Sequence, residues 1–225
     1  LVQRDRGHWL EPIPDRLVIP ASADPTERMI FKQSIRLAFV TALQHLAPKQ
    51  RAALLLTEVV GLSAAEAAET LDTTPAAVDS ALQRARATLA QHRLEAAMEL
   101  SDSQRDLLQR YLTAFEAYDT EQLVGLLRED AVLNMPPFSM WIRGPREIHA
   151  WLKGIGNGCR GSRLLPIEAC GASAFAQYRV NPEGGHKAFA LITLELAGDR
   201  VATMTSFLDV ETLFPRFGLP IKLPA

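Results

Sequence analysis

Residues 73–89 carry small, polar and basic side chains in an order that suits nucleic-acid recognition. Ala76 and Ser80 come first and are followed by Gln83, Arg84 and Arg86. Serine and glutamine can read base edges by hydrogen bonding, whereas arginine also pairs with phosphate. Small residues at the start of a helix and arginines later along it are typical of a helix that enters the major groove.

The spacing of apolar residues predicts that 73–89 is helical. Thr73 or Thr74 can cap the N-terminus by accepting an otherwise unpaired backbone N–H, and Pro75 suits the first turn. The apolar residues recur at i, i+4, i+7 and i+11 and therefore form one stripe, which leaves the polar and basic residues on the remaining surface. This stripe consists of Val78, Leu82, Ala85 and Leu89.

A short helix is predicted directly upstream, over 63–71. Ser63 with Glu66 three residues later is a capping-box pattern, and only a tight turn around Asp72 and Thr73 separates the two helices. Two helices joined in this way have the geometry of a helix-turn-helix. Any pair of packed helices would show the same spacing, so spacing alone leaves both interpretations open.

Two further helices are expected before this pair, over 35–46 and 49–60. Pro48 suits the N-terminus of the second, and Gly61 ends it. The predicted buried faces consist of Ile35, Phe39, Ala42, Leu43 and Leu46 in the first helix, and Ala52, Leu55, Leu56 and Val59 in the second. Together the segments predict one four-helix unit that ends near residue 92.

The run PKQR at 48–51, followed by AALLLTEVVGLSAAEAAETL and VDSALQRARATL, closely resembles region 4 of the sigma-70 family of bacterial transcription initiation factors. The resemblance is to the extracytoplasmic-function (ECF) group and covers about 35–94. In that family region 4 contacts the promoter −35 element and the flap of the RNA polymerase β subunit, so the resemblance implies promoter DNA and RNA polymerase core as partners. It places the DNA contacts at Thr74, Ala76, Ala77, Ser80, Gln83, Arg84 and Arg86.

Within that set, the resemblance assigns the alanines, Ser80 and Gln83 to base edges or the groove floor, and the two arginines to phosphates. Asp79 departs from the family pattern, because many relatives have Lys, Arg or Asn at this position. A carboxylate facing phosphates is repulsive. We therefore expect weak DNA affinity for this chain alone, with specificity supplied by the assembled polymerase.

The first 30 residues contain four prolines and no sustained periodicity, which predicts an extended linker. The segment HWLEPIPD, with Trp9 and Pro12, resembles the connector that follows region 2 in this ECF group. Nothing in the sequence corresponds to region 2, which reads the −10 element in sigma factors. We therefore expect a C-terminal fragment of a longer protein, which cannot initiate transcription by itself.

The composition of the 225 residues allows two modest globular domains. The net charge of −2 is unusual for a free-standing DNA binder, although residues 32–94 hold seven basic and five acidic residues. No run of eighteen uncharged apolar residues or secretory signal is present, so we expect a cytoplasmic protein without a membrane partner. Cys159 and Cys170 are expected to be free buried thiols.

The second half of the chain predicts an α+β domain. A helix over 104–118, capped by Ser101 or Ser103, carries a broad apolar stripe, and a short helix follows over 123–127. Alternating residues then predict strands at 131–135, 140–143, 163–168, 173–180, 187–196 and 200–208, with a helix over 145–155 among them. This order predicts a curved antiparallel sheet wrapped on helices.

That order, with YLTAFEAYDTEQLVGLLREDAVLNMPP, WIRGPREIHAWL and FLDVETLFPRFGLP, resembles the SnoaL-like domain of the nuclear-transport-factor-two-like superfamily over about 103–220. It also resembles the version fused to certain ECF sigma factors. The resemblance implies a cone with an open mouth, in which a small-molecule ligand of unknown identity could bind. The candidate pocket residues are Tyr111, Phe115, Tyr118, Met135, Phe138, Trp141, Trp151, Phe175, Tyr178, Phe207 and Asp209, with Arg143 and His149 as further polar candidates.

Catalysis would require an acid–base pair in this cone. Asp209 or His149 could serve as the base and Tyr111 or Tyr178 as the hydrogen-bond donor, but no pair has motif spacing, and an ordinary core needs the same aromatic residues. The five histidines have no second metal ligand at i+3 or i+4, and the glycine pairs lack the context of a phosphate loop. We expect no enzyme activity, no metal and no cofactor.

These expectations combine into a domain assignment. Residues 1–31 form the linker, 32–94 region 4, 95–102 a connector, and 103–225 the SnoaL-like domain with a C-terminal tail. In ECF factors of this kind the resemblance implies that the second domain regulates the first, and 211–223 is either a contact arm or a tail packed on its own sheet. We expect a monomer outside the polymerase; the alternative is a dimeric one-component regulator in which a SnoaL-like sensor or enzyme is fused to a helix-turn-helix.

Overall fold

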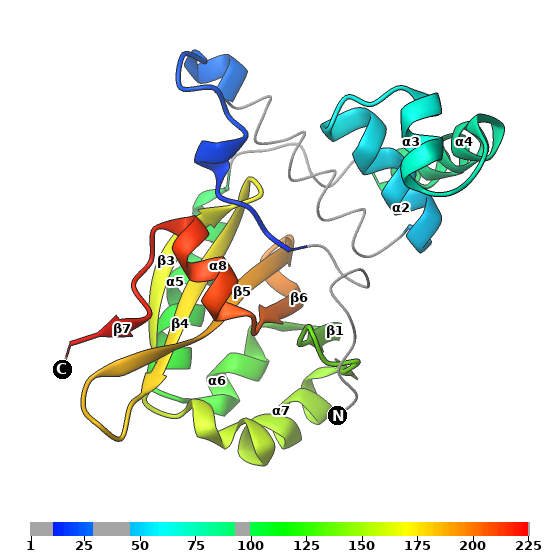
Figure 1. Cartoon of the computed structure of the whole chain (residues 1–225). Helices are drawn as coiled ribbons and strands as arrows, with labels where there is room; N and C mark the ends of the chain where they lie inside the picture. Colours follow the sequence, from blue (N-terminus) through cyan, green and yellow to red (C-terminus); the bar gives the residue numbers. More distant parts are fainter. Residues whose placement is uncertain (1–10, 29–45, 93–99, 225) are drawn as a thin grey trace. The chain divides into compact units, whose positions relative to one another are not determined.

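The computed structural model describes residues 11–28, 46–92 and 100–224 (Figure 1). The chain divides into two compact units, and each has its own buried residues. The helical unit lies within Val18–Met98, and the α+β unit combines the chain up to Leu17 with Glu99–Ala225. The helix predicted over 35–46 falls almost entirely on residues that lie outside the described part.

The helical unit begins, in its described part after residue 45, with α2 (Pro48–Leu54), which continues directly into the π-helical segment η3 (Leu55–Val59). Ala53 and Leu54 are the buried residues of this stretch, whereas Ala52, Leu55 and Leu56 are only partly buried. The prediction of which residues form the buried face of this helix was therefore wrong. Helix α2 packs against α4, a tertiary contact that the local period does not show, and the wider turn closed by Val60 N–H to the Leu55 carbonyl oxygen at 3.0 Å comes after the buried pair.

The helices α3 (Ala64–Thr70) and α4 (Pro75–His92) form the predicted pair. Ser63 and Glu66 make the expected capping box, with Ser63 N–H donating to Glu66 Oε2 at 2.8 Å. Thr74, rather than Thr73, caps α4, because its Oγ1 accepts the N–H of Ala77 at 3.2 Å. Asp72 turns the chain between the helices with a φ of 48°.

The α+β unit is built on one seven-stranded sheet in the order β2-β1-β6-β5-β4-β3, with β7 paired to β5 (Figure 1). All pairings are antiparallel except that of β1 with β6, which is parallel. The strands are β1 (Leu127–Asn134), β2 (Trp141–Arg143), β3 (Arg163–Ala169), β4 (Ala172–Val180), β5 (His186–Ala197), β6 (Arg200–Phe207) and β7 (Lys222–Leu223).

Helices α5 (Asp102–Glu116), α6 (Thr120–Gly125), α7 (Pro145–Lys153) and α8 (Val210–Phe217) accompany this sheet, with the 3₁₀ turn η4 (Ile155–Cys159) after α7. The helix predicted over 123–127 was placed too late. Asp119 starts α6 by accepting the N–H of Gln122 at 3.0 Å, and Leu127 already belongs to β1. Helix α8 was not predicted, because it contains Pro215 and a proline disfavours the interior of a helix.

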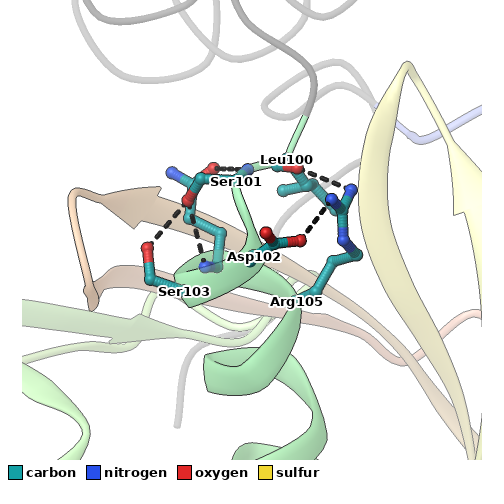
Figure 2. Close-up of polar contacts among 6 residues, drawn as sticks. Leu100, Ser101, Asp102, Ser103 and Arg105 are labelled. Atoms are coloured by element: carbon teal, nitrogen blue, oxygen red, sulfur yellow. Dashed lines mark hydrogen bonds and ion pairs between the residues drawn. The ribbon is translucent and has the colours of Figure 1, made fainter.

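The first turn of α5 is held by a dense set of polar contacts (Figure 2). Ser101 Oγ accepts the N–H of Gln104 at 3.2 Å, and Gln104 Oε1 accepts the N–H of Ser101 at 3.1 Å. Arg105 pairs with Asp102 at 2.7 Å in the same turn. Ser101 is therefore the cap of the two predicted serines, and Ser103 hydrogen-bonds to its hydroxyl at 2.8 Å.

The sheet has apolar residues on both faces. Tyr111 of α5 stacks on Phe175 of β4 with ring centroids 5.8 Å apart. Tyr178, three residues further along β4, instead meets Phe214 of α8 edge-on at 5.2 Å. Figure 1 shows α5 behind the sheet and α8 in front of it. The tail from α8 onward is thus packed on its own sheet, with Leu213 and Phe214 fully buried.

Residues 11–17, here called the strap, belong to the α+β unit although the sequence predicts them to be part of a linker. Pro14 forms an antiparallel bridge with Ala169 at the end of β3. The carbonyl oxygen of Ile13 accepts the N–H of Cys170 at 3.1 Å, and Asp15 Oδ1 accepts the N–H of Gly171 at 2.8 Å. The strap thereby covers the turn between β3 and β4.

Candidate functional site

Helix α4 presents an exposed face of small and polar residues. Ala76, Ser80 and Gln83 are exposed and are spaced by four and three residues, so they share one side of the helix. Val78 and Ala85 on the opposite side are 1% and 0% exposed, and α4 packs against α2 and α3. Burial of the apolar stripe therefore fixes which residues face outward.

Helix α4 carries three of the nine charged residues of 46–92. Arg84 and Arg86 are exposed, but so is Asp79, and residues 46–92 contain four basic and five acidic residues. Arg51 is used internally, because its Nη2 donates to the Leu46 carbonyl oxygen at 3.3 Å and burial lowers its pKa. The surface can meet only a few phosphates, which predicts a shallow dependence of DNA affinity on salt.

The α+β unit contains a cavity with about 530 Å³ of space not filled by atoms, some of it open to solvent. Its walls come from α5, α6, α7 and one face of the sheet. Gly156 lets the Trp151 ring lie against the backbone, because a Cβ at this glycine would come within 2.5 Å of the ring. The lining residues are Tyr111, Phe115, Leu123, Leu127, Leu133, Met135, Ile148, Trp151, Leu152, Cys159, Gln177, Phe189, Ile192, Met204 and Ser206.

The polar groups of this lining are all uncharged side chains. The Gln177 amide donates to Ser162 Oγ at 3.0 Å, and the Tyr111 hydroxyl donates to the Met204 sulfur at 3.8 Å. Burial raises the pKa of Tyr111, so its hydroxyl stays a hydrogen-bond donor at any physiological pH. The other polar side chains of the lining are Ser206, Cys159 and Trp151.

Comparison with known proteins matches both units to families. Residues 36–89 match sigma-70 region 4, and residues 108–207 match the SnoaL-like domain. The ECF RNA polymerase sigma factor SigG of Mycobacterium tuberculosis is 44% identical over 231 residues, covering 99% of this chain and 61% of that protein. The chain is a homologue of ECF sigma factors, with a region 4 followed by a SnoaL-like domain.

Two comparisons with SigJ of Mycobacterium tuberculosis agree with this assignment. The ECF RNA polymerase sigma factor SigJ is 26% identical over 172 residues, covering 72% of this chain and 54% of that protein. The crystal structure of SigJ matches with a TM-score of 0.55 and 20% identity, covering 95% of this chain and 76% of the crystal chain, and so supports the fold. The chain spans about three fifths of the length of SigG.

In region 4, the residues predicted to contact DNA are all exposed: Thr74, Ala76, Ala77, Ser80, Gln83, Arg84 and Arg86. The hydroxyl of Thr74 is engaged in the helix cap, which gives it a positioning role. Ala87 is also exposed and lies four residues after Gln83 on the same face. It was not among the predicted contacts, because the resemblance places none after Arg86.

In the SnoaL-like domain, the cavity contains only part of the predicted pocket set. Tyr111, Phe115, Met135 and Trp151 line it, but the other candidates do not. Trp141 is 68% exposed on the edge strand β2, and Tyr178 lies on the α8 side of the sheet. The remaining candidates outside the lining are Tyr118, Phe138, Arg143, His149, Phe175, Phe207 and Asp209.

The acid–base groups considered from the sequence do not meet in this cavity. Asp209 lies at the N-terminus of α8, and His149 on α7 contacts Thr120 at 3.1 Å and Glu121 at 3.2 Å. The Tyr178 hydroxyl donates to the Pro220 carbonyl oxygen at 3.0 Å. Only Tyr111 of the four lines the cavity, so its described walls offer a donor without a carboxylate or imidazole base.

The described residues contain neither a membrane-spanning helix nor a metal-binding cluster. None of the helices in 11–28, 46–92 and 100–224 combines the length and apolarity that a membrane span needs. The same part of the chain holds no cluster of three His, Cys, Asp or Glu residues suited to a metal ion. Cys159 and Cys170 are both free and buried, as expected.

Proposed function

We propose that region 4 of this chain recognises the promoter −35 element and the RNA polymerase β flap, and that the SnoaL-like domain modulates this activity. The observation that carries the proposal is that every predicted DNA-contacting residue is exposed, on α4 or, for Thr74, at its cap, in a chain 44% identical to SigG. Both binding partners reside with the bacterial chromosome, so the proposed location is the cytoplasm.

Weak DNA binding by the chain alone is part of the proposal. Two exposed arginines and one exposed carboxylate on α4 leave little net attraction for phosphate. Base contacts on the α4 face would then select sequence only when another protein holds region 4 near the promoter. The β flap is the partner that would supply this local concentration.

The proposed route of modulation is the strap. The strap ends at Leu17, and the helical unit begins at Val18 and continues to Met98, where the chain returns to the SnoaL-like domain. Region 4 is therefore tethered to that domain at both ends while the strap is docked. Release of the strap would free one tether and widen the range of positions that region 4 can reach.

Calorimetric titration of the whole chain with the isolated β flap tests the first half of the proposal. We expect binding, and we expect the complex to prefer a −35 duplex over a duplex with a scrambled −35 element. An Asp79→Asn variant should strengthen binding to both duplexes, because it removes a carboxylate from a surface that faces phosphates.

Failure of the β flap to bind would contradict the proposal. A stable dimer that binds symmetric DNA would instead favour the one-component regulator. For the second half, Asp15→Ala, which removes the strap contact to Gly171, should change flap or promoter affinity, whereas equal affinities for variant and parent would contradict modulation through the strap.

A further inference from the structure

Basic residues gather at one end of the sheet, where β4 leads into β5. This basic end consists of three segments that meet there: 157–163, 178–188 and 219–223. They contain five Lys or Arg residues and one Glu, although the whole chain has a net charge of −2. Arg179 is paired with Lys187 on the adjacent strand, and Lys187 is paired with Lys222 on β7, which lies beside β5 near the C-terminus (Figure 1). Like charges directly opposite each other destabilise a sheet, so folding alone does not explain this row of cations.

Most cations elsewhere on the described α+β unit are neutralised by a carboxylate. These pairs are Arg105–Asp102, Arg110–Asp106, Arg128–Asp130, Arg146–Glu147, Lys153–Glu121 and Arg216–Glu11. At the basic end, only Lys222 has such a pair among the described residues, with the exposed Glu183 at 3.7 Å. Glu116 lies at the same end, but its Oε1 accepts the N–H of Leu164 at 2.9 Å. The cations that pair with no carboxylate in the described part of the chain are Arg160, Arg163, Arg179 and Lys187.

Two of these arginines are held in place by aromatic rings. The guanidinium carbon of Arg179 lies 3.3 Å from the centroid of the Phe189 ring, and its Nη2 donates to Cys159 Sγ at 3.0 Å. The guanidinium carbon of Arg160 lies 5.2 Å from the centroid of the Tyr118 ring. A cation that is already positioned loses less conformational entropy when an anion binds.

The basic end fits backbone phosphates better than a protein partner. Within its three segments, all of which the structure describes, Val180 is the only large apolar side chain that is exposed. A protein interface needs an apolar centre, whereas phosphate binding needs only cations and reads no sequence.

We propose that the basic end binds the backbone phosphates of duplex DNA next to the element that region 4 recognises. The proposal rests on the proposed −35 recognition for its position on the promoter, and the experiment below separates the two.

Such contacts add affinity without sequence specificity. The four exposed cations of the basic end are Arg160, Arg163, Lys187 and Lys222. Each neutralised phosphate contributes about −0.9 to the slope of the logarithm of the binding constant against the logarithm of the salt concentration. So few contacts give only weak binding, with a Kd of about 10⁻⁴ to 10⁻⁶ M at physiological salt, so the β flap is still needed to hold the chain on the promoter.

The salt dependence of DNA binding tests the proposal. The whole chain is titrated into a fluorescent −35 duplex and into a scrambled duplex, and anisotropy is followed at several salt concentrations. The double substitution Lys187→Gln with Lys222→Gln should make the salt slope shallower by about two and weaken binding to both duplexes by the same factor. The matched control is Arg110→Gln with Arg146→Gln, which removes the same charge from cations that pair with carboxylates and should leave the slope unchanged.

A substitution in region 4 distinguishes the two proposals. Arg84→Ala should make the slope shallower by about one more in the parent and in the double variant alike. If the recognition by region 4 fails, Arg84→Ala has no effect while the effect of the lysine substitutions remains, and if the basic end does not bind DNA the reverse holds.

Three outcomes would overturn the inference. An unchanged slope in the double lysine variant, with a circular dichroism spectrum equal to that of the parent, would remove the phosphate contacts. An equal loss of slope in the control variant would show that only the overall charge matters. Displacement of the duplex by poly-L-glutamate at a lower concentration of charge than by unlabelled duplex would assign the basic end to an acidic protein instead.

Discussion

Docking of the strap can be measured through Cys170, which the strap covers. The thiol is 1% exposed, its sulfur accepts the N–H of Ile13 at 3.3 Å, and burial raises its pKa to about 12. A thiol reagent can therefore reach Cys170 only after the strap leaves. With Cys159 replaced by serine, the rate of labelling reports the population of the undocked state.

Asp15→Ala is the substitution that should shift this population most. Asp15 is 6% exposed, and its carboxylate accepts the N–H of Gly171 at 2.8 Å. A hydrogen bond to a charged group contributes about 1.5–3 kcal/mol, so its loss should raise the labelling rate by roughly 10- to 150-fold. Arg216→Ala is the control, because it removes only the partly exposed ion pair with Glu11 and should change the rate by less than about fivefold.

The experiment distinguishes strap release from unfolding of the whole domain. Labelling through strap release should depend only weakly on urea, because little surface is exposed, whereas global unfolding would give the full urea dependence of the domain. A labelling rate in Asp15→Ala equal to that of the parent would refute the view that the carboxylate holds the strap.

Three further predictions concern pH, DNA contacts and the helix cap. Folding raises the pKa of Cys170, so the stability that this thiol contributes is complete below about pH 8.5, the pKa of an exposed thiol, and falls as pH rises towards 12. Below pH 8.5 the labelling rate rises because more of the exposed thiol is ionised, and above pH 8.5 it rises because strap release becomes more favourable. The labelling rate should therefore climb about tenfold per pH unit without a plateau near pH 8.5. In anisotropy titrations, Arg84→Ala should weaken DNA binding equally across sequences and reduce the salt slope by about one, whereas Gln83→Ala should cost about 1–3 kcal/mol at one base position only. Ser101→Ala should lower the free energy of unfolding in urea by about 1 kcal/mol.

Features that depend on a few neighbouring residues could be predicted from the sequence. The caps at Ser63, Thr74 and Ser101 follow from one side chain and a backbone N–H three residues away. The buried stripe of α4 follows from the helical period, and the exposed recognition face follows from that stripe. Local chemistry therefore sufficed to predict which residues of α4 are exposed, whereas their assignment as DNA contacts came from the family resemblance and stays a prediction.

Features that depend on distant residues could not be predicted in this way. The strap contact joins Asp15 to Gly171, and no periodicity near either residue indicates it. Helix α8 persists despite Pro215 because Phe214 is fully buried against the sheet, so tertiary packing outweighs the local preference. Likewise, side chains along β4 alternate between the two faces of the sheet, but this alternation does not indicate which face borders the cavity and which borders α8.

The connection of the two units gives strap docking a consequence for any partner of region 4. If binding of the β flap requires a position that region 4 reaches only with the strap released, then the free energy of docking opposes binding. By linkage, the factor by which strap release strengthens flap binding equals the factor by which the flap promotes strap release. The flap should then accelerate labelling of Cys170 in the parent chain and accelerate it less in Asp15→Ala, where the strap is already largely free. An identical labelling rate with and without saturating flap would show that the two equilibria are independent.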